Sequence, residues 1–411
     1  MSTQRVAFIL CEYPLGVSSM VINSIRLFAA KGFRVDVYIN KRTMDSSPID
    51  FREKQVSFNI YDDDSLNLVS RGYRYILMQI SKLLAPIVRY LSFNFCLFMY
   101  YHDVFLFRRW LKKKLSDYSY VYFMPIECKS LLCLNHINDK NKIIYYNMEL
   151  LDWEDEDRYK QTLKKLEYQM ISELSNAVIP SPRRAELFAK INDFDLSKIF
   201  ILPVASMGDP IRARSKYFRE LFGIPDDWKI VVYSGNIAPW AKCLEIIQSV
   251  KDWPDGYALV MHTWNKSVVG TRYYNEMINE ARGLPVYFSS EYITYDDLAV
   301  ALSSADIGVM FYEEIDDNFT EILFSSNKFG EYLKAGLAII CSEFVSLKDF
   351  VEERSIGAAI SIRELPRAVR LIGEKIEILR ENAHACYEEQ LRFENYFERF
   401  YDRLVSEGHD A

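Results

Sequence analysis

Residues that could bind an anionic ligand gather in one short segment, SSNKFGEYLKAG, residues 325–336. Three polar residues stand directly before a predicted helix and can cap its amino end: Ser325, Ser326 and Asn327. The unpaired N–H groups of a first helical turn, the positive end of the helix dipole and the Lys328 ammonium together suit a diphosphate. Glu331 follows about one turn later, where its carboxylate could accept hydrogen bonds from ribose hydroxyls. The segment therefore predicts a nucleoside diphosphate site, and the alternative is a well-capped surface helix.

A second pattern of this kind lies upstream, in the sequence IVVYSGN. It predicts a strand that ends at Gly235 and is followed by a helix over residues 238–250. A glycine at this place lets the backbone approach phosphate oxygens closely. Lys242, in the first turns of the helix, could neutralise the same phosphates. Glycine also serves packing alone at such turns, so the pattern gains its weight from its pairing with residues 325–336.

The elements that must position these residues follow from the length and from the alternation of strands and helices. A chain of 411 residues exceeds what one hydrophobic core usually serves, which favours two α/β domains. Strand 5–11, helix 17–31 and strand 33–40 form the first strand–helix–strand unit, and a second alternation starts at residue 229. Such alternation is typical of parallel sheets.

The expected division is a first domain over residues 1–204, a second over 205–390, and a C-terminal helix and tail over 391–411, with the linker around 202–208. The last helix carries an apolar face made of Phe393, Phe397, Phe400 and Leu404. That face must pack against something. We expect the helix to cross back to the first domain, and the alternative is a helix that caps the second domain.

Composition describes an ordinary folded protein, since half of the residues are hydrophobic and 26% are charged. The net charge of −7 argues against general nucleic-acid binding. The seven cysteines are scattered, without the spacing of a zinc site, and suggest reduced thiols in a cytoplasm. No signal peptide is recognisable at the start, the five histidines are isolated, and the acidic run 152–157 is better explained as a solvated helix start than as a metal site.

Residues 71–115 depart from this acidic balance, with nine Lys or Arg, one acid and eleven aromatic residues. Basic and aromatic side chains together suit an anionic membrane surface. The longest uncharged run, residues 90–102, is shorter than the ~20 residues of a spanning helix. We therefore expect a peripheral protein on the inner face of the cytoplasmic membrane. Two alternatives are a plain aromatic core with solvated charges and a basic surface that holds a polyanionic acceptor.

Residues 200–400 resemble the donor-binding domain of glycosyltransferases with the GT-B fold, especially the large retaining group of bacterial polysaccharide-assembly enzymes. The resemblance is carried, in order, by VVYSGNIAPWAKCLEIIQSV, DDLAVALSSADIGVMF and SSNKFGEYLKAGLAIICSE. The first domain resembles the family loosely. The resemblance implies two Rossmann-like domains that face each other across a cleft.

For the donor, the resemblance implies phosphate contacts from Ser326, Asn327 and Lys328 and a ribose contact from Glu331. It makes Gly235 the glycine of the phosphate loop and Lys242 its basic residue. Ser325 precedes this set, and His262, at the end of a predicted strand, could contact the base or the phosphates or could be structural.

Two positions depart from the family pattern. Asn236 stands where many members have Arg, and Leu323 stands where the group often has a Glu that contacts the donor sugar. Glu321 could replace that Glu and is a catalytic candidate. Its competitors in the same loop are Asp316, Asp317 and Thr320.

On the acceptor side, Gly16 in PLGVSS resembles a glycine of the acceptor loop, and a simple turn is its alternative role. Asn147 and Glu149 follow the strand IIYY, where many relatives have a His or an acidic residue that faces the cleft. Glu149 is the second catalytic candidate, as a base or as a polar positioning group.

Together these observations predict a hexosyltransferase that moves a sugar from a nucleotide diphosphate sugar to a saccharide acceptor, which a lipid could carry, in bacterial surface polysaccharide synthesis. A retaining mechanism is the expectation. Neither a cofactor nor a metal is expected, because lysines and helix-end N–H groups can stabilise the leaving diphosphate. The alternatives are a nucleotide-sugar epimerase on the same fold and a nucleotide-binding scaffold protein without catalysis.

Overall fold

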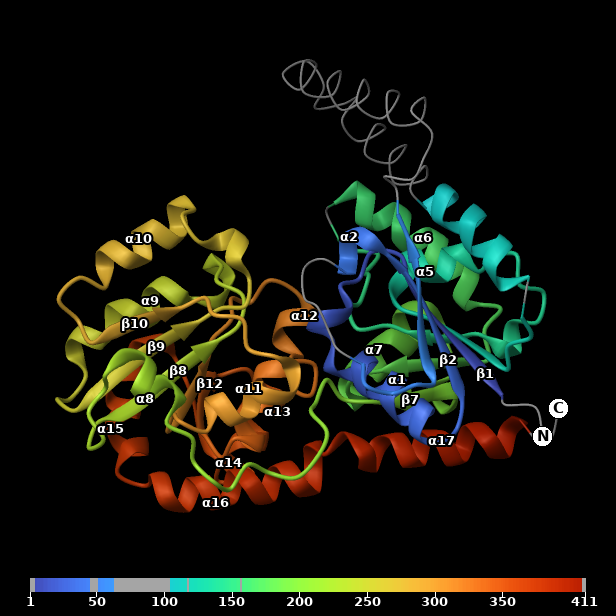
Figure 1. Cartoon of the computed structure of the whole chain (residues 1–411). Coiled ribbons are helices and arrows are strands. Elements are labelled where there is room, and N and C mark those ends of the chain that lie inside the picture. The colour runs from blue at the N-terminus through green and yellow to red at the C-terminus, as the bar shows by residue number, and fades with distance from the viewer. Residues whose placement is uncertain (1–3, 45–50, 63–103, 117, 156, 409–411) are drawn as a thin grey trace, which may run out of the picture. The chain divides into compact units, whose positions relative to one another are not determined.

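The computed structural model describes residues 4–44, 51–62, 104–116, 118–155 and 157–408 (Figure 1). Most of the predicted membrane segment, residues 71–103, therefore lies outside the described residues. The chain divides into two compact units, Met1–Leu202 and Pro203–Ala411. The division falls at the start of the linker predicted around residues 202–208. Each unit is described by itself.

The first unit is built on parallel strands. They are β1 (Arg5–Leu10), β2 (Arg34–Asn40), β3 (Val56–Tyr61), β4 (Tyr122–Pro125), β5 (Ile144–Tyr146), β6 (Asn176–Ile179) and β7 (Ile199–Ile201). They pair in the orders β3-β2-β1-β4 and β5-β6-β7. Two bridges, Phe123 to Ile143 and Ile126 to Tyr146, join β4 to β5. The carboxyl ends of the neighbouring strands therefore lie along one edge.

Helices connect these strands. They are α1 (Ser19–Ala30), α2 (Lys41–Met44), α5 (Glu127–Cys133), α6 (Arg158–Ile171), α7 (Pro182–Asn192) and a helix over residues 104–115. Polar side chains fix where they begin. Ser18 caps α1, Asp157 caps α6, and Ser181 caps α7, where Pro182 takes the first helical position. The acidic run 152–157 thus leads into a helix start.

The helix over residues 104–115 turns its apolar face into the core of the first unit, through Val104, Phe107, Leu111 and Leu115. Trp110 also packs there, against Phe107. Of the described aromatic side chains of this helix, those of Phe107 and Trp110 belong to the core. The exposed positions are Phe105, Arg109 and the three lysines 112–114.

The second unit holds a parallel sheet of order β10-β9-β8-β11-β12-β13 (Figure 1). Its strands are β8 (Lys229–Ser234), β9 (Tyr257–His262), β10 (Val286–Ser289), β11 (Ile307–Met310), β12 (Ala338–Ser342) and β13 (Gly357–Ile360). The central strands are buried on both faces, so they appear in the sequence as continuous apolar runs. Ile230 and Val232 join one core cluster, while Val231 and Tyr233 join the other.

Helices cover both faces of this sheet. Residues of α9 (Cys243–Ser249), α10 (Arg272–Glu280) and α15 (Leu365–Gly373) pack on one face. Residues of α8 (Tyr217–Phe222), α11 (Tyr295–Leu302), α13 (Asn327–Lys334), α14 (Val345–Glu353) and α16 (Ile376–Cys386) pack on the other. The short α12 (Asp317–Thr320) precedes α13.

The final helix, α17 (Phe393–Gly408), buries the four residues of the predicted apolar face, Phe393, Phe397, Phe400 and Leu404. Phe397 forms ring contacts with both Phe393 and Phe400. The return of this helix to the first domain stays a prediction.

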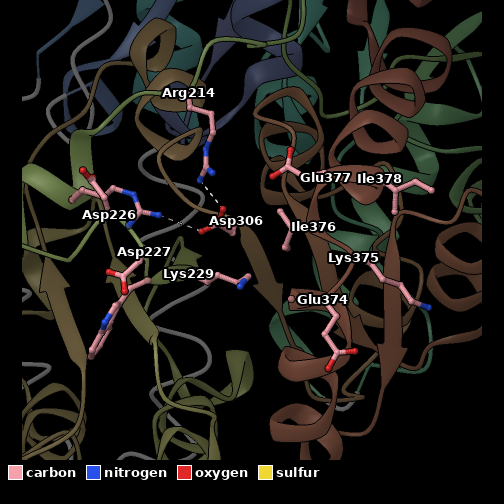
Figure 2. A pocket seen from close by; sticks show the side chains of 13 residues that line it. Arg214, Asp226, Asp227, Lys229, Asp306, Glu374, Lys375, Ile376, Glu377 and Ile378 are labelled. Atoms are coloured by element: carbon pink, nitrogen blue, oxygen red, sulfur yellow. Dashed lines mark hydrogen bonds and ion pairs between the residues drawn. The ribbon is translucent and has the colours of Figure 1, made fainter.

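At the amino-terminal edge of the second sheet, a buried carboxylate joins several elements. Asp306 lies just before β11, and its side chain forms an ion pair with Arg214 (Figure 2). It forms further ion pairs with Arg219 and Arg380. It also accepts the N–H of Ile230 at 2.9 Å. A cavity of about 530 Å³ opens beside this cluster. Ligands of open α/β sheets bind at the opposite, carboxyl edge, so we assign this cluster a structural role.

Replacing Asp306 by Ala should therefore destabilise the protein, because it leaves guanidinium groups uncompensated around a buried position. Loss of one partner of a buried ion pair costs about 3 kcal/mol or more. The free energy of unfolding, measured by urea denaturation, should fall by about this amount in Asp306→Ala. Asp226→Ala is the control, because the Asp226–Lys216 pair is exposed and should contribute less than about 1 kcal/mol. Equal denaturation midpoints for Asp306→Ala and wild type would contradict the assignment.

Candidate functional site

The order of the second sheet reverses between β8 and β11. These strands are neighbours although β9 and β10 come between them in the sequence. The chain runs outward from β8 to β10 and then returns to β11 on the other side of β8. Ligands in open α/β sheets bind beyond the carboxyl ends of the strands at such a reversal. Gly235 follows β8 at this point, and Phe311 and Tyr312 follow β11.

The structure brings Gly235 and Lys328 together at this reversal. A Cβ atom built on Gly235 would lie 2.5 Å from Lys328 Cε and 2.9 Å from its Nζ. The lysine side chain therefore lies against the backbone of residue 235, which glycine permits because it has no side chain. The two sequence patterns, one after β8 and one at the start of α13, therefore lie side by side.

Aromatic rings surround the Lys328 ammonium. Its Nζ lies 5.2 Å from the ring centre of Tyr233 and 5.1 Å from that of Tyr312, within the range of cation–π attraction. The ring of Trp240 stacks on Tyr312, with centroids 6.1 Å apart and planes inclined by 5°. These rings were not predicted from the sequence, because nothing in the local pattern separates them from core residues. Within the described parts of the chain, no carboxylate forms an ion pair with Lys328.

Tyr332 fixes α13 at the same point. Its ring packs on Gly308 of β11, where a Cβ atom would lie 2.4 Å from the tyrosine Cδ2. Its hydroxyl accepts the N–H of Ser234 at 2.8 Å and lies 3.3 Å from the carbonyl of Val309. One side chain thus joins α13 to the ends of β8 and β11, which sets where the amino end of the helix points.

The amino end of α13 differs from the sequence expectation. The helix begins at Asn327, and its N-cap residue Ser326 makes no side-chain capping bond within the described chain. The Ser326 hydroxyl pairs instead with that of Tyr312, at 2.9 Å. The buried Ser325 hydroxyl has no hydrogen-bond partner among the described residues. The prediction of side-chain capping was wrong, and Ser326 does not compete with an external anion for the first helical turn.

The helix predicted over residues 238–250 is interrupted. Residues Pro239–Ala241 form a 3-10 turn, Lys242 takes the left-handed conformation with φ 50°, and α9 begins at Cys243. Lys242 therefore lies before the first turn of α9 and not within a continuous helix. It lines a cavity of about 410 Å³ together with Glu321 and Tyr312. This cavity also contacts Ser342, at the end of β12, and so lies at the carboxyl edge of the sheet.

The three alternatives to Glu321 in the same loop differ in whether they line this cavity. Asp316 caps α12 by accepting the N–H of Asn318, and neither Asp316 nor Asp317 lines the cavity. Thr320 lines it, next to Glu321. Glu321 lines the cavity together with Lys242, and so do the carboxylates Glu314 and Glu343.

Asn236 and Glu331 form internal contacts. The Asn236 carbonyl accepts a hydrogen bond from the Tyr233 hydroxyl at 2.5 Å, and its side chain accepts one from Asn265 at 3.2 Å. Glu331 is 4% exposed, and its Oε1 accepts a hydrogen bond from the Ser206 hydroxyl at 2.5 Å. Burial raises the pKa of the Glu331 carboxyl group. In this structure the carboxylate holds the start of the second unit, and its contact with ribose stays a prediction.

The structure turns His262 inward. It is 2% exposed, packs against the ring of Phe218 and shares a hydrogen bond with Ser289 at 3.1 Å. These contacts favour the structural alternative, and a contact with the donor stays a prediction. The His262 backbone carbonyl accepts the N–H of Gly235 at 3.0 Å, which helps to fix the turn after β8.

On the first unit, Gly16 lies in the 3-10 turn Leu15–Val17 after β1, and Asn147 and Glu149 follow β5. Asn147 is 1% exposed and donates hydrogen bonds to the Tyr145 hydroxyl and the Glu149 carbonyl. It belongs to a buried network, and its role as an acceptor contact stays a prediction. Glu149 has an exposed side chain and can reach a ligand.

The chain as a sequence matches no protein-family model and no curated protein. As a structure it matches sucrose-phosphate synthase from Thermosynechococcus elongatus with a TM-score of 0.67 and 14% identity, over 98% of this chain and 99% of that chain. It matches Anabaena HepE in complex with UDP-glucose with a TM-score of 0.67 and 12% identity, over 98% and 99%. A glycosyltransferase from Rickettsia africae gives 0.63 and 10%, over 99% of both chains.

These structures define the class of the fold. The chain has the GT-B fold of nucleotide-sugar glycosyltransferases along its whole length, and the predicted fold class is confirmed. At identities of 10–14% the likeness concerns the fold, so the activity must be argued from the residues of this chain.

The burial of His262 predicts a pH dependence of stability. Burial lowers the pKa of its imidazole from 6.5 to about 4. The unfolded chain therefore binds the proton at higher pH, so the stability that His262 contributes is complete above pH 6.5 and is lost as the pH falls toward 4. In His262→Gln, the free energy of unfolding should fall less between these pH values than in wild type, by ~3 kcal/mol at most. Urea denaturation at several pH values measures this, and parallel curves would contradict it.

Proposed function

We propose that the protein transfers a hexosyl group from a nucleoside diphosphate sugar to a saccharide acceptor. The observation that carries the proposal is the Lys328 ammonium, which lies against Gly235 at the reversal of the second sheet without a carboxylate partner among the described residues. An uncompensated, partly buried cation needs an anion beside it. The amino end of α13 adds its own positive end at the same place.

These groups suit the chemistry of transfer. When the bond from the sugar to the diphosphate breaks, negative charge grows on the leaving phosphate. Lys328 and the first-turn N–H groups of α13 lie where they can stabilise it, and fixed donors of this kind lower the barrier by several kcal/mol. The cavity of about 410 Å³ with Lys242 and Glu321 is adjacent through Tyr312, and we propose that it receives the sugar.

Further details of the proposal rest on the resemblance to the retaining GT-B glycosyltransferases and on the basic residues of the first unit. We propose that the configuration at the sugar is retained, that Glu321 contacts the donor sugar, and that Glu149 contacts the acceptor hydroxyl. We further propose that the acceptor is a saccharide carried by a lipid, in surface polysaccharide synthesis. Lysines and helix N–H groups supply the positive charge in this scheme, so that no metal ion is required. In the described parts of the chain, His, Cys, Asp and Glu form no group that could hold one.

The site makes a direct prediction for Lys328→Ala. Removal of a charged contact to the diphosphate should weaken the binding of UDP, GDP or ADP, whichever binds wild type best, by about 10- to 100-fold. Isothermal titration calorimetry measures the dissociation constant. Lys348→Ala is the matched control, because Lys348 is an exposed lysine of α14 in the same unit and should bind the nucleotide as wild type does.

Two outcomes would overturn the proposal. If no nucleoside diphosphate binds wild type, the donor site is wrong. If Lys328→Ala binds as tightly as wild type, the proposed contact is wrong. Product analysis then separates the activities, since an epimerase would convert the donor sugar without an acceptor, and a scaffold protein would bind the nucleotide without turnover.

We propose that the first unit associates with anionic membranes through its basic surface. Arg109 and the lysines 112–114 are exposed on the described helix over residues 104–115, and the nearby Phe105 is 59% exposed. Each cation close to an anionic surface contributes about 1 kcal/mol. None of the described helices has the length and apolar character to cross a membrane.

The membrane proposal is tested by liposome flotation with phosphatidylserine vesicles. Five cations are changed together to Gln: Arg108, Arg109, Lys112, Lys113 and Lys114. The bound fraction should fall at least tenfold, because several favourable charge contacts are lost. The control variant changes five exposed cations of the second unit to Gln: Lys266, Arg272, Arg282, Lys348 and Arg363. Flotation that is absent in wild type, or lost equally in both variants, would contradict the proposal.

A further inference from the structure

Glu127 lies close to a candidate site residue of the first unit, although its local sequence pattern does not predict this. It is the first residue of α5, one residue beyond the end of β4, and the intervening Ile126 forms a bridge with Tyr146 at the end of β5. Its Oε1 accepts the backbone N–H of Met148 at 2.9 Å and that of Glu149 at 3.2 Å. The Glu127 carboxyl group is thus hydrogen-bonded to the backbone of the segment that carries Glu149, the exposed candidate for acceptor contact.

The backbone of Glu127 is unusual as well. Its φ is 65°, in the left-handed region that costs a residue with a Cβ atom about 1 kcal/mol or more. Glycine would adopt this conformation without that cost. A glutamate persists here because its side chain makes contacts that compensate. The two hydrogen bonds to the backbone of 148 and 149 are such contacts.

Other residues anchor the same segment from neighbouring elements. The N–H of Asn147 donates to the carbonyl of Val178, and the Asn147 side chain donates to the Glu149 carbonyl at 3.0 Å. The Arg184 guanidinium donates to the Met148 carbonyl. Residues 147 and 148 are buried by these contacts, whereas the side chain of Glu149 is exposed. The segment is fixed in its backbone and presents a single carboxylate outward.

Several titratable groups lie near Glu127. They are Tyr13 in the loop after β1, Cys128 of α5, Tyr145 of β5, Glu149, and Glu167 of α6. Arg184 of α7 interacts in turn with Tyr13. Burial, and next the charge of Glu149, raises the pKa of Glu127 well above its ordinary value.

We propose that Glu127 is the positioning residue of the acceptor side, which holds the 147–149 backbone so that the Glu149 carboxylate can accept a hydrogen bond from the acceptor hydroxyl. This rests on the proposed transferase function. Glu127 itself does not touch the acceptor. Its role is to fix the direction of Glu149, since a misplaced hydrogen-bond acceptor weakens binding even when its charge is unchanged.

Two substitutions separate the hydrogen bonds from the backbone strain. Glu127→Gln keeps an oxygen that accepts both N–H groups and has the shape of a protonated carboxyl. Glu127→Gly suits the left-handed backbone but removes the acceptor oxygen. Glu154→Gln is the control, because Glu154 is an exposed glutamate in the following loop.

In transfer assays Glu127→Gly should raise the KM for the acceptor about tenfold. Its kcat and its affinity for the nucleoside diphosphate that binds wild type best should stay close to wild type. Glu127→Gln and Glu154→Gln should behave as wild type. Hydrogen exchange of the 148 and 149 amides should become faster in Glu127→Gly and stay slow in Glu127→Gln.

The possible outcomes distinguish a failure of this inference from a failure of the proposed function. Wild type that binds no nucleoside diphosphate, or transfers no sugar, overturns the function and the acceptor role of Glu127 with it. Wild type that transfers sugar while Glu127→Gly keeps the wild-type acceptor KM overturns the inference alone. Unchanged amide exchange in Glu127→Gly overturns it without any activity measurement.

Discussion

The second unit depends on one constraint, the reversal of strand order between β8 and β11. The reversal leaves a gap in the helical cover beyond the two strand ends, because the connections leave in opposite directions. Tyr332, packed on Gly308 and bonded to the Ser234 N–H, fixes α13 beside that gap. Lys328, in the first turn of the same helix, is thereby brought against Gly235. The candidate site is a consequence of where this helix begins.

The electrostatics of the site follow from the same arrangement. Lys328 is held by the faces of Tyr233 and Tyr312 and has no carboxylate partner in the described chain, so its charge stays available to a ligand. Ring faces attract a cation without neutralising it. Asp306, at the other edge of the sheet, is surrounded by guanidinium groups and joins the elements there. The proposed donor site and the Asp306 cluster thus lie at opposite edges of the sheet, and the larger of the two cavities lies beside Asp306.

In the first unit, the neighbouring ends of β4 and β5 have a corresponding effect. They bring Glu127 against the backbone of Met148 and Glu149, residues about twenty positions away in the sequence. The strained backbone at Glu127 is maintained by those hydrogen bonds. Both units therefore place their polar candidates at the carboxyl edges of parallel strands, each through a side chain that acts on the backbone of another element.

The sequence by itself determined the alternation of strands and helices and the pairing of Gly235 with Lys328, because these depend on periodic apolar runs and on local turn chemistry. The GT-B fold class followed from the resemblance of its motifs to that family. It did not determine which way a side chain faces once a strand or helix is packed. His262 ends β9 and Asn147 follows β5, at the expected edges, but both residues are buried. Glu127 and the ring pair of Tyr312 and Trp240 carried no local signal. Only the tertiary structure decided these points, since facing direction and desolvation arise from contacts between residues that the sequence keeps far apart.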